Sequence, residues 1–338
     1  MTKKVHWGIL STASIAERRV LPAMLACEHA ELTAIASRSL DKAKAVAAKF
    51  QIPKAYGSYD ELFNDPEVEV IYNPLPNHLH VEWSIRAASH GKHVLCEKPI
   101  SRDVAEARRL LQSRNDYRVK IGEAFMVRTH PQWLRAAELV QNGRIGKPRS
   151  VLGYFSYFNV DPANVRNIAD NAGGALMDIG CYPIKTSRFV LGEEPLRVFA
   201  SIDRDPSFKT DRLTSAILEF PSAQSVFTCS TQMVNYQRMQ FFGDTGRIEI
   251  EIPFNAPADR PTRIFIDDGR ELYGNASAVI ETFAVANQFT IQADLFSIAI
   301  RNNTEVPNPL EDAICNMAVI DALFRSAHTG RWETPERL

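Results

Sequence analysis

The chain has 338 residues, which is more than a single hydrophobic core usually holds, so its length favours two domains. Hydrophobic residues make up 45% of the chain and charged residues 23%, and this mixture excludes an intrinsically disordered protein. The formal net charge of −1 gives no electrostatic footprint for nucleic acid or for an anionic membrane surface.

The N-terminal residues and the cysteines indicate the compartment. The chain starts without the apolar region and cleavage site of a signal peptide, and no apolar run approaches membrane-spanning length. The cysteines are odd in number and widely scattered, at Cys27, Cys96, Cys181, Cys229 and Cys315. Such a set predicts reduced thiols rather than disulfides or a zinc site. We therefore expect a soluble, cytoplasmic protein without a metal.

Residues 1–124 alternate between apolar runs and helical patterns. The expected strands are Val5–Leu10, Glu31–Ala36, Val68–Tyr72, His93–Cys96 and Val119–Gly122. The expected helices are Ile15–Ala26, Asp41–Phe50, His80–Ser89 and Arg102–Gln112. Strands that are apolar throughout and alternate with helices are typical of a parallel sheet covered on both faces. We predict an α/β domain built on a parallel sheet.

Residues 125–338 show a different rhythm. Helices are expected at Pro131–Asn142, from Gly174 to Val190, at Ala284–Arg301 and at Pro309–His328. Strands are expected at Arg149–Phe158, Val198–Ile202, Thr214–Phe220, Gln224–Thr231, Arg238–Gly243, Gly246–Ile252 and Arg263–Ile266. Strands in succession predict an antiparallel sheet. The second domain is therefore expected to be α+β, with a sheet open on one face.

The first strand–helix turn has small residues where a dinucleotide fold needs close approach of phosphates. Ser11, Ala13 and Ala16 stand where the usual motif has its three glycines. An ordinary turn is the alternative reading, but the place after the first strand favours a nucleotide. The residues expected to contact the cofactor here are Ser11, Thr12, Ala13, Ser14 and Ile15.

The end of the second strand bears on the type of cofactor. An NAD enzyme normally carries an acidic residue there for the ribose hydroxyls, and this chain has Ser37, Arg38 and Ser39 instead. Asp41 comes too late and is expected to open the next helix. Arg38, with Ser37, Ser39 and Lys42, can bind a 2′-phosphate. NADP is therefore expected, with NAD as the alternative.

Two segments carry the predicted chemistry. Lys98 follows the fourth strand, at the edge of the sheet where ligands bind, and can stabilise an alkoxide as hydride leaves. Pro99 restricts the backbone of Lys98. Asp178 and Tyr182, after Gly173 and Gly174, lie four positions apart and share a helix face. A tyrosine hydroxyl near a lysine ammonium suits proton exchange with a carbinol.

These motifs resemble the glucose–fructose oxidoreductase/inositol dehydrogenase/rhizopine catabolism (Gfo/Idh/MocA) family. The resemblance rests on Glu97-Lys98-Pro99 and on Gly173-Gly174 followed by Asp178, Gly180 and Tyr182, and it covers nearly the whole chain. Ser11 and Ala13 depart from the family's phosphate loop. A tyrosine at position 182 resembles the branch of aldose dehydrogenases, glucose–fructose oxidoreductase and dimeric dihydrodiol dehydrogenase, whereas inositol dehydrogenases more often carry histidine.

The resemblance implies that residues 1–124 form a Rossmann domain that binds the dinucleotide, and that residues 125–338 form a substrate-binding and oligomerisation domain with a large open sheet. It also implies roles for individual residues. Lys98 would contact substrate and nicotinamide, Tyr182 would be the general acid/base, and Asp178 would orient the substrate. The Lys98–Pro99 peptide is expected to be cis, and oligomers, commonly dimers, are expected to form through the open sheet face. Residues expected against the cofactor are Pro74, Leu75, Asn77, His78, Glu97, Lys98 and Glu123.

Other polar residues keep two interpretations. Arg128, His130 and Gln132 are expected either to line the substrate cleft or to cap the helix at Pro131. Arg166 and Asn167 are expected to bond sugar hydroxyls, with a mobile surface loop as the alternative. His78 and His80 do not share a helix face and form no metal site. The aromatic run Tyr154, Phe155, Tyr157 and Phe158 is expected to serve sheet packing or a dimer interface.

The sequence therefore predicts an NADP(H)-dependent oxidoreductase that acts on a CH–OH or C=O group of a sugar or diol. An aldose 1-dehydrogenase is the leading expectation. A trans-dihydrodiol or dicarbonyl oxidoreductase is the alternative within this class. A non-catalytic NADP-binding sensor of the same fold is the alternative outside it, and the presence of Lys98, Asp178 and Tyr182 argues against the sensor.

Overall fold

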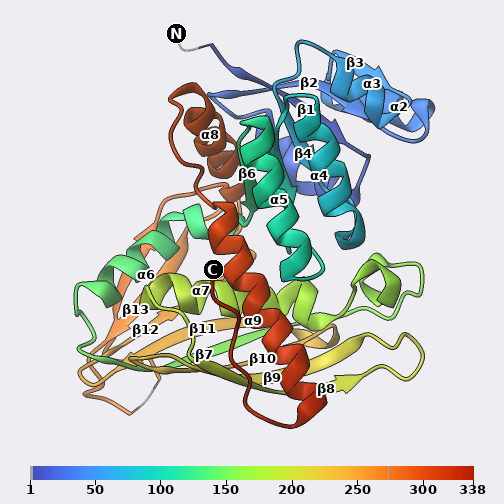
Figure 1. Ribbon diagram of the computed structural model, residues 1–338. Helices are drawn as coiled ribbons and strands as arrows, with labels where there is room; N and C mark the ends of the chain where they lie inside the picture. The colour runs from blue at the N-terminus through green and yellow to red at the C-terminus, as the bar shows by residue number, and fades with distance from the viewer. Residues whose placement is uncertain (1–2, 273) are drawn as a thin grey trace. The chain divides into compact units, whose positions relative to one another are not determined.

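A computed structural model describes residues 3–272 and 274–338 (Figure 1). These residues form two compact units. The first unit contains residues up to 126 together with 287–314, and the second contains residues 127–286 and 315–338. The first unit therefore takes in a later segment of the chain in addition to the predicted domain 1–124.

The first unit is built on a parallel sheet in the order β3-β2-β1-β4-β5-β6. Its strands are β1 (Val5–Leu10), β2 (Ala30–Ala36), β3 (Lys54–Tyr56), β4 (Val70–Asn73), β5 (His93–Glu97) and β6 (Ile121–Ala124). This is the strand order of a doubly wound dinucleotide-binding fold. The predicted α/β fold class is confirmed.

Helices connect these strands. They are η1 (Ala16–Val20) continuing into α1 (Leu21–Met24), α2 (Leu40–Phe50), α3 (Tyr59–Asn64), η2 (Asn77–Leu79), α4 (His80–Ser89), α5 (Val104–Tyr117) and α8 (Gln288–Arg301). Ser39, Ser58 and Asp103 cap three of them by accepting a bond from a backbone N–H in the first turn. Gly91, with a φ of 73°, follows the end of α4.

Helix α8 joins the first unit through aromatic packing. The ring centroids of Trp7 in β1 and Phe296 in α8 lie 5.7 Å apart. The indole N–H of Trp7 donates to the hydroxyl of Ser297 at 3.0 Å, and all three side chains are buried. A fully buried indole needs such a partner, so α8 forms part of the core beneath β1.

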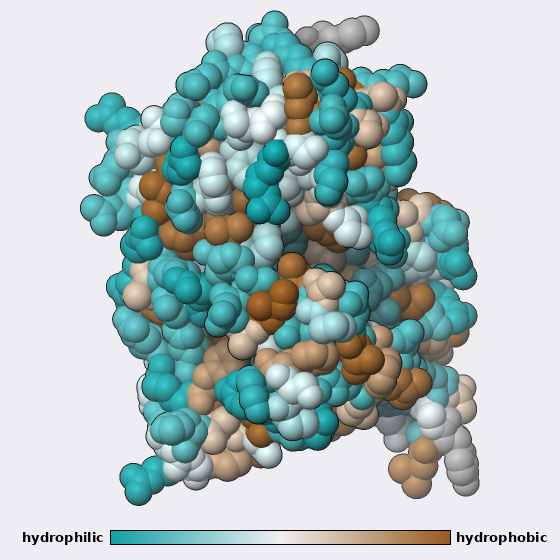
Figure 2. Space-filling model, turned by 90° about the vertical axis from the view of Figure 1, so that its right-hand side faces the viewer, coloured by the Kyte–Doolittle hydropathy of each residue, from teal (hydrophilic) through white to brown (hydrophobic). Residues whose placement is uncertain are grey.

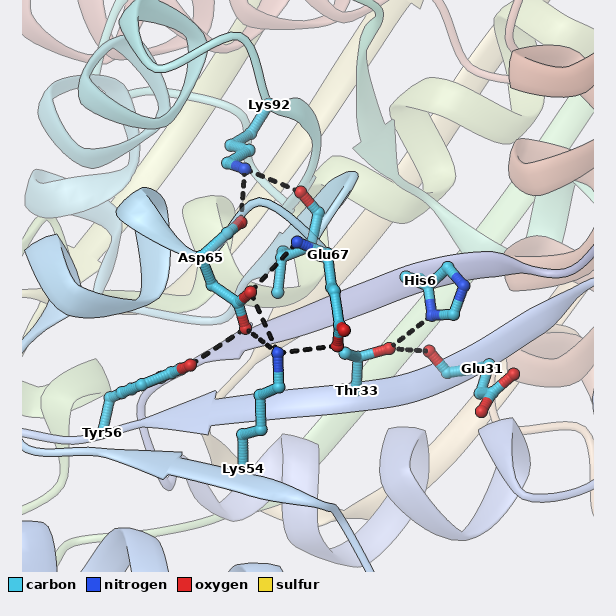
Figure 3. A network of polar contacts seen from close by, with 9 residues as sticks. His6, Glu31, Thr33, Lys54, Tyr56, Asp65, Glu67 and Lys92 are labelled. Atoms are coloured by element: carbon cyan, nitrogen blue, oxygen red, sulfur yellow. Dashed lines mark hydrogen bonds and ion pairs between the residues drawn. The ribbon is translucent and has the colours of Figure 1, made fainter.

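The sequence analysis missed the short edge strand β3 and helix α3. A polar network holds them in place (Figure 3). The buried carboxylate of Asp65 accepts bonds from the ammonium of Lys54 at 2.9 Å and from the hydroxyl of Tyr56 at 2.9 Å. Lys92 donates to the carbonyl oxygens of Asp65 and Val68. Pairing between residues so far apart leaves no local hydrophobic pattern, which is why the strand escaped prediction.

The second unit is built on a sheet in the order β14-β13-β12-β11-β7-β10-β9-β8. Its strands are β7 (Pro148–Phe158), β8 (Arg197–Arg204), β9 (Asp211–Glu219), β10 (Gln224–Ser230), β11 (Gln232–Gly243), β12 (Arg247–Ile250), β13 (Thr262–Asp267) and β14 (Val279–Phe283). Strands β7 and β10 pair in parallel, and the other neighbours are antiparallel. The predicted mostly antiparallel sheet is confirmed, whereas β14 and the first half of β11 were missed.

One face of this sheet is covered by helices, as Figure 1 shows for α6, α7 and α9. The helical segments of this unit are η3 (Met126–Thr129), α6 (Pro131–Gln141), η4 (Val165–Asn167), η5 (Ala169–Asn171), η6 (Leu176–Gly180), α7 (Cys181–Leu191) and α9 (Leu310–Thr329), of which the last continues from the first unit. Gly153 allows helix α7 to pack closely on the sheet, because an added Cβ would lie 2.9 Å from Pro183 in α7 and from Met239 in β11.

The opposite face of the sheet carries a row of apolar side chains across neighbouring strands. Phe199, Ile217, Val226 and Leu152 lie side by side in the strand register. The exposed fractions of Val226 and Leu152 are 37% and 42%. Residues 3–272 and 274–338 contain no helix that is both long and apolar enough for a membrane span. On the face drawn in Figure 2, hydrophilic residues predominate and hydrophobic ones form small groups.

Candidate active site

The turn after β1 has the backbone geometry of a phosphate-binding loop. Ser11 has a φ of 81°, a left-handed conformation that favours glycine, and its N–H donates to the carbonyl oxygen of Ala36 at 2.9 Å. Thr12 and Ala13 are half-buried and Ser14 is exposed, and the helix begins at Ser14. The loop therefore keeps a glycine-like turn without glycine, beside the N–H groups of a helix start. This geometry fits a dinucleotide pyrophosphate.

The end of β2 presents donors at the start of α2. The hydroxyl of Ser37 accepts a bond from Ser39 N–H, and the hydroxyl of Ser39 accepts one from Lys42 N–H. Both hydroxyls keep a hydrogen to donate. Arg38 is exposed between them, and Asp41 lies in the first turn of α2 as predicted. These groups fit an anionic phosphate better than a pair of ribose hydroxyls.

The segment after β4 is fixed from within. The side chain of Asn73 donates to the carbonyl oxygen of His80 and to Ser84, and accepts from Leu75 N–H. Pro74 and Leu75 are buried, whereas Asn77 and His78 are half-buried. Among the described residues, the buried Nδ1 atom of His78 has no hydrogen-bond partner. A ligand that bonds His78 would satisfy it, which again fits a cofactor at this edge.

The Lys98 segment follows β5 at the carboxyl edge of the sheet, and buried side chains hold it. The Lys98–Pro99 peptide bond is cis, as expected. Glu97 accepts a bond from the hydroxyl of Tyr72 at 2.7 Å and one from Lys98 N–H at 3.3 Å. Glu123 accepts a bond from Ile100 N–H at 3.1 Å. Both predicted carboxylates therefore bond to the segment that carries Lys98.

Glu97 differs from an ordinary surface carboxylate because of burial. Burial raises the pKa of Glu97, and the bond from Tyr72 together with the charge of Lys98 only partly offsets that effect. A nearby ammonium therefore stabilises a carboxylate that would otherwise be costly to bury.

His80 links the two segments at this edge. Its Nδ1 lies 2.8 Å from the carbonyl oxygen of Pro99, and its Nε2 lies 2.6 Å from that of Leu75. Only a protonated imidazolium could donate to both oxygens at once. Complete burial opposes that charge and lowers the pKa of His80 to about 4, although both carbonyl bonds favour protonation. The ring is therefore neutral near pH 7 and donates to one carbonyl at a time.

In the second unit, Gly174 and Asp211 set the start of the helix that carries Asp178 and Tyr182. Gly174 has a φ of 116°, and an added Cβ there would collide with Asp211 Oδ1. Asp211, which is buried in β9, accepts a bond from Leu176 N–H at 2.6 Å. The predicted Gly-Gly turn is thus required by a carboxylate that satisfies the first turn of the helix.

Asp178 and Tyr182 stand in different surroundings one turn apart. One carboxylate oxygen of Asp178, Oδ2, accepts a bond from the hydroxyl of Tyr157 at 2.6 Å and pairs with Nε of Arg166 at 2.8 Å. Tyr182 is buried to 5% exposure, and its ring packs against Phe155 and Phe254. The structure therefore joins two predicted site residues, Asp178 and Arg166, and adds Tyr157.

The remaining candidates have structural partners within the second unit. The amide of Asn167 is buried and donates to Asn159 and Asp161 within its own loop. The guanidinium of Arg128 lies 5.1 Å from the ring centre of Phe189. His130 is the N-cap of α6 and accepts a bond from Gln132 N–H, so the capping interpretation is confirmed for His130.

Sequence reasoning missed Tyr72, Tyr157 and Asp211, which act through contacts between distant strands and helices. The alternation along β7 contained a usable signal for Tyr157. Tyr157 has the parity of Gly153, which contacts helix α7, whereas Tyr154 points to the opposite face. Within residues 3–272 and 274–338, no group of His, Cys, Asp and Glu side chains could hold a metal ion.

Comparison with known proteins supports the family that the sequence resembles. Residues 5–125 match an oxidoreductase family with an NAD-binding Rossmann fold, and residues 133–249 match the GFO/IDH/MocA C-terminal domain. The chain belongs to the Gfo/Idh/MocA family of oxidoreductases. The family resemblance, the enzyme class and the dinucleotide cofactor predicted from the sequence are confirmed.

Individual relatives are similar over nearly their whole length. An oxidoreductase of Rhizobium meliloti is 47% identical, covering 98% of this chain and 99% of that protein. The D-xylose 1-dehydrogenase (NADP(+)) 2 of Haloferax volcanii is 37% identical, covering 96% and 98%. A 3-ketoreductase from Actinomadura kijaniata, solved with TDP-benzene and NADP, has a TM-score of 0.86 at 29% identity, covering 96% of this chain and 98% of that one.

Proposed function

We propose that this Gfo/Idh/MocA oxidoreductase is an NADP-dependent aldose 1-dehydrogenase. The observation that carries the proposal is a lysine at the carboxyl edge of the dinucleotide-binding sheet, in a segment held by buried side chains. Glu97, Glu123 and His80 fix the backbone on either side of Lys98. A lysine fixed there suits a reaction in which negative charge develops on a substrate oxygen.

The protein's own residues bind the substrate and accept its proton. Bound NADP would accept the hydride from the substrate carbon. Tyr182 takes the hydroxyl proton, and Lys98 stabilises the oxygen as its charge develops. Arg166 bonds another substrate oxygen, and Asp178 orients the substrate through its ion pair with Arg166. The D-xylose dehydrogenase activity named for the Haloferax volcanii relative supports a sugar as the substrate.

NADP rather than NAD is proposed because of the second strand end. Arg38 and the hydroxyls of Ser37 and Ser39 stand at the N-terminus of α2, where a 2′-phosphate would meet both donors and the positive end of the helix. The names of the dehydrogenase relative and of the ketoreductase structure both include NADP, which supports the same choice.

We also propose a dimer formed through the open face of the second unit's sheet. The row Phe199, Ile217, Val226 and Leu152 offers apolar surface that a second copy of the chain could cover. Self-association by the same patch on both partners is the commonest form of symmetric dimer.

A substrate panel tests the proposed activity. Purified protein is mixed with NADP and with aldoses, polyols and cyclic diols, and the absorbance of reduced nicotinamide is followed. We expect turnover of a pentose or hexose, with NAD a poorer cofactor. If NADPH binds tightly and none of these compounds is oxidised, a sensor of the same fold becomes the better interpretation. Reduction of ketones alone would favour a ketoreductase, as in the Actinomadura kijaniata protein.

A further inference from the structure

A cluster in the second unit unites three side chains from separate elements. Tyr157 comes from β7, Arg166 from η4 and Asp178 from η6, and both partners meet the same carboxylate oxygen of Asp178. The side chain of Asp178 is 13% exposed, whereas that of Arg166 is 42% exposed. The cluster therefore has a largely buried carboxylate, that of Asp178, and an accessible guanidinium, that of Arg166.

The backbone of Arg166 is fixed as firmly as its side chain. Its carbonyl oxygen accepts a bond from Gly174 N–H at 2.8 Å. An added Cβ at Gly173 would collide with the same carbonyl group. The Gly173–Gly174 pair therefore holds Arg166 against the start of the helix that carries Asp178 and Tyr182. An arginine at the surface that did not have to be held at one position would not need such a close backbone contact.

The charges of the cluster balance. The carboxylate of Asp178 is the main cause that raises the pKa of Arg166. Burial, with Asp178 beside it, raises the pKa of Tyr157, so its hydroxyl stays protonated and donates to that carboxylate.

We propose that Arg166 binds the substrate oxygen on the carbon next to the reacting carbon, and that Tyr157 and Asp178 are positioning residues for its guanidinium. The inference rests on the proposed function and assigns the substrate class: compounds with oxygen on two adjacent carbons, such as aldoses and vicinal diols. Asp178, the partner of Arg166, lies one turn before Tyr182, so Tyr182 serves the reacting oxygen and Arg166 serves the neighbouring one.

The chemistry of the pair favours a neutral neighbouring group. A guanidinium offers only donors, so its ligand must accept hydrogen bonds. Asp178 already neutralises Arg166, which leaves little net attraction for a phosphate or carboxylate. A hydroxyl or carbonyl oxygen accepts a bond from Arg166 and brings no uncompensated charge into the site.

The test compares substrates that differ only in the neighbouring oxygen. Values of kcat/KM are measured with NADP for D-glucose against 2-deoxy-D-glucose, and for trans-1,2-cyclohexanediol against cyclohexanol. Removal of the neighbouring oxygen removes a hydrogen bond to a charged donor. We therefore expect kcat/KM to be about 10- to 100-fold higher for the oxygen-bearing member of each pair. This ratio does not depend on the fraction of folded enzyme, so a purely structural defect would leave it unchanged.

Variants test whether the preference for the oxygen-bearing substrate comes from the cluster of Tyr157, Arg166 and Asp178. Arg166→Gln is expected to bring the ratio close to one, Arg166→Lys to restore part of it, and Tyr157→Phe to lower it by several-fold. Tyr154→Phe is the matched control, because Tyr154 lies in the same strand but its hydroxyl contacts Met233 Sδ at 3.7 Å. NADPH binding in every variant checks that the first unit is intact.

The outcomes separate this inference from the proposed function. If sugars are oxidised but the ratio is near one in the unaltered protein, or is unchanged in Arg166→Gln, the inference is overturned and the dehydrogenase assignment stands. If none of the compounds is oxidised although NADPH binds, both are overturned. A ratio that falls with Arg166→Gln and Tyr157→Phe but holds in Tyr154→Phe supports the inference.

Discussion

Ser11 shows how single residues preserve the geometry of a motif while changing its letters. Its φ of 81° is the conformation that glycine supplies at this position in most dinucleotide folds. The sequence predicted the position of the loop but not that a serine would keep the left-handed turn. Lys98, Asp178 and Tyr182 could be predicted because each lies in a local motif. Tyr72 and Tyr157 were not, since their partners lie 25 and 21 positions away.

Cofactor preference is tested at Arg38. Arg38→Asp replaces a phosphate-binding cation by an acceptor for ribose hydroxyls, so the preference for NADP over NAD should fall by about 100-fold or more. The measurement is kcat/KM for each cofactor, or the dissociation constants of NADPH and NADH. Arg109→Asp, an exposed arginine on α5, is the control and should leave the preference unchanged. An unchanged preference in Arg38→Asp would show that the strand end does not read the 2′-phosphate.

At the level of elements, periodicity predicted most helices and strands, and α4 was predicted to the residue. Elements held by distant polar contacts were missed, such as β3 with its Asp65 network. The start of the Asp178 helix shows the same limit. The Gly173–Gly174 turn was visible in the sequence, but the carboxylate that requires it lies in β9, at Asp211. Local patterns indicate an element, whereas its anchor belongs to the packed fold.

Asp211 gives this anchor a pH dependence. Burial raises its pKa to about 6 from an ordinary 3.8, despite the bonds from Leu176 N–H and Thr214 that favour the carboxylate. A folded-state pKa above the unfolded one means that the stabilisation is complete below about pH 4 and is lost as pH rises through 6. The loss corresponds to about 3 kcal/mol.

The prediction concerns the difference in unfolding free energy between the unaltered protein and Asp211→Asn. Relative to the variant, the unaltered protein should become less stable by about 2 kcal/mol as pH rises from 4.5 to 7. Urea unfolding at a series of pH values measures this difference. Asp203→Asn, whose carboxylate is 51% exposed on β8, is the control and should show no such trend. A pH-independent difference for Asp211→Asn would refute the raised pKa of this carboxyl group.

At the level of the whole molecule, the family match fixes the fold and the enzyme class, and the open sheet face bears on assembly. The sequence predicted a sheet that is open on one face, and helices α6, α7 and α9 cover the opposite face. Leu152 and Val226 lie on the open face. The sequence could indicate that one face stays open, but not which of the two faces the chain itself covers.

The double variant Leu152→Lys, Val226→Lys tests the proposed dimer. Two ammonium groups in the centre of a self-associating face would repel their copies and lose apolar burial, so the variant should sediment as a monomer. Sedimentation equilibrium measures the mass of both proteins. Leu134→Lys, at an exposed leucine on α6, is the control and should remain dimeric. If the unaltered protein is itself a monomer, the open face does not form this interface.

The central claim is that Lys98 and Tyr182 carry out NADP-dependent oxidation of a CH–OH group. The most direct measurement is the turnover of Lys98→Met with NADP and the preferred aldose, together with its affinity for NADPH. We predict that turnover falls by at least about 1000-fold while NADPH binding changes little, because the loss of charge stabilisation affects the transition state. Lys49→Met, on the exposed side of α2, should remain fully active. Full activity in Lys98→Met would contradict the account.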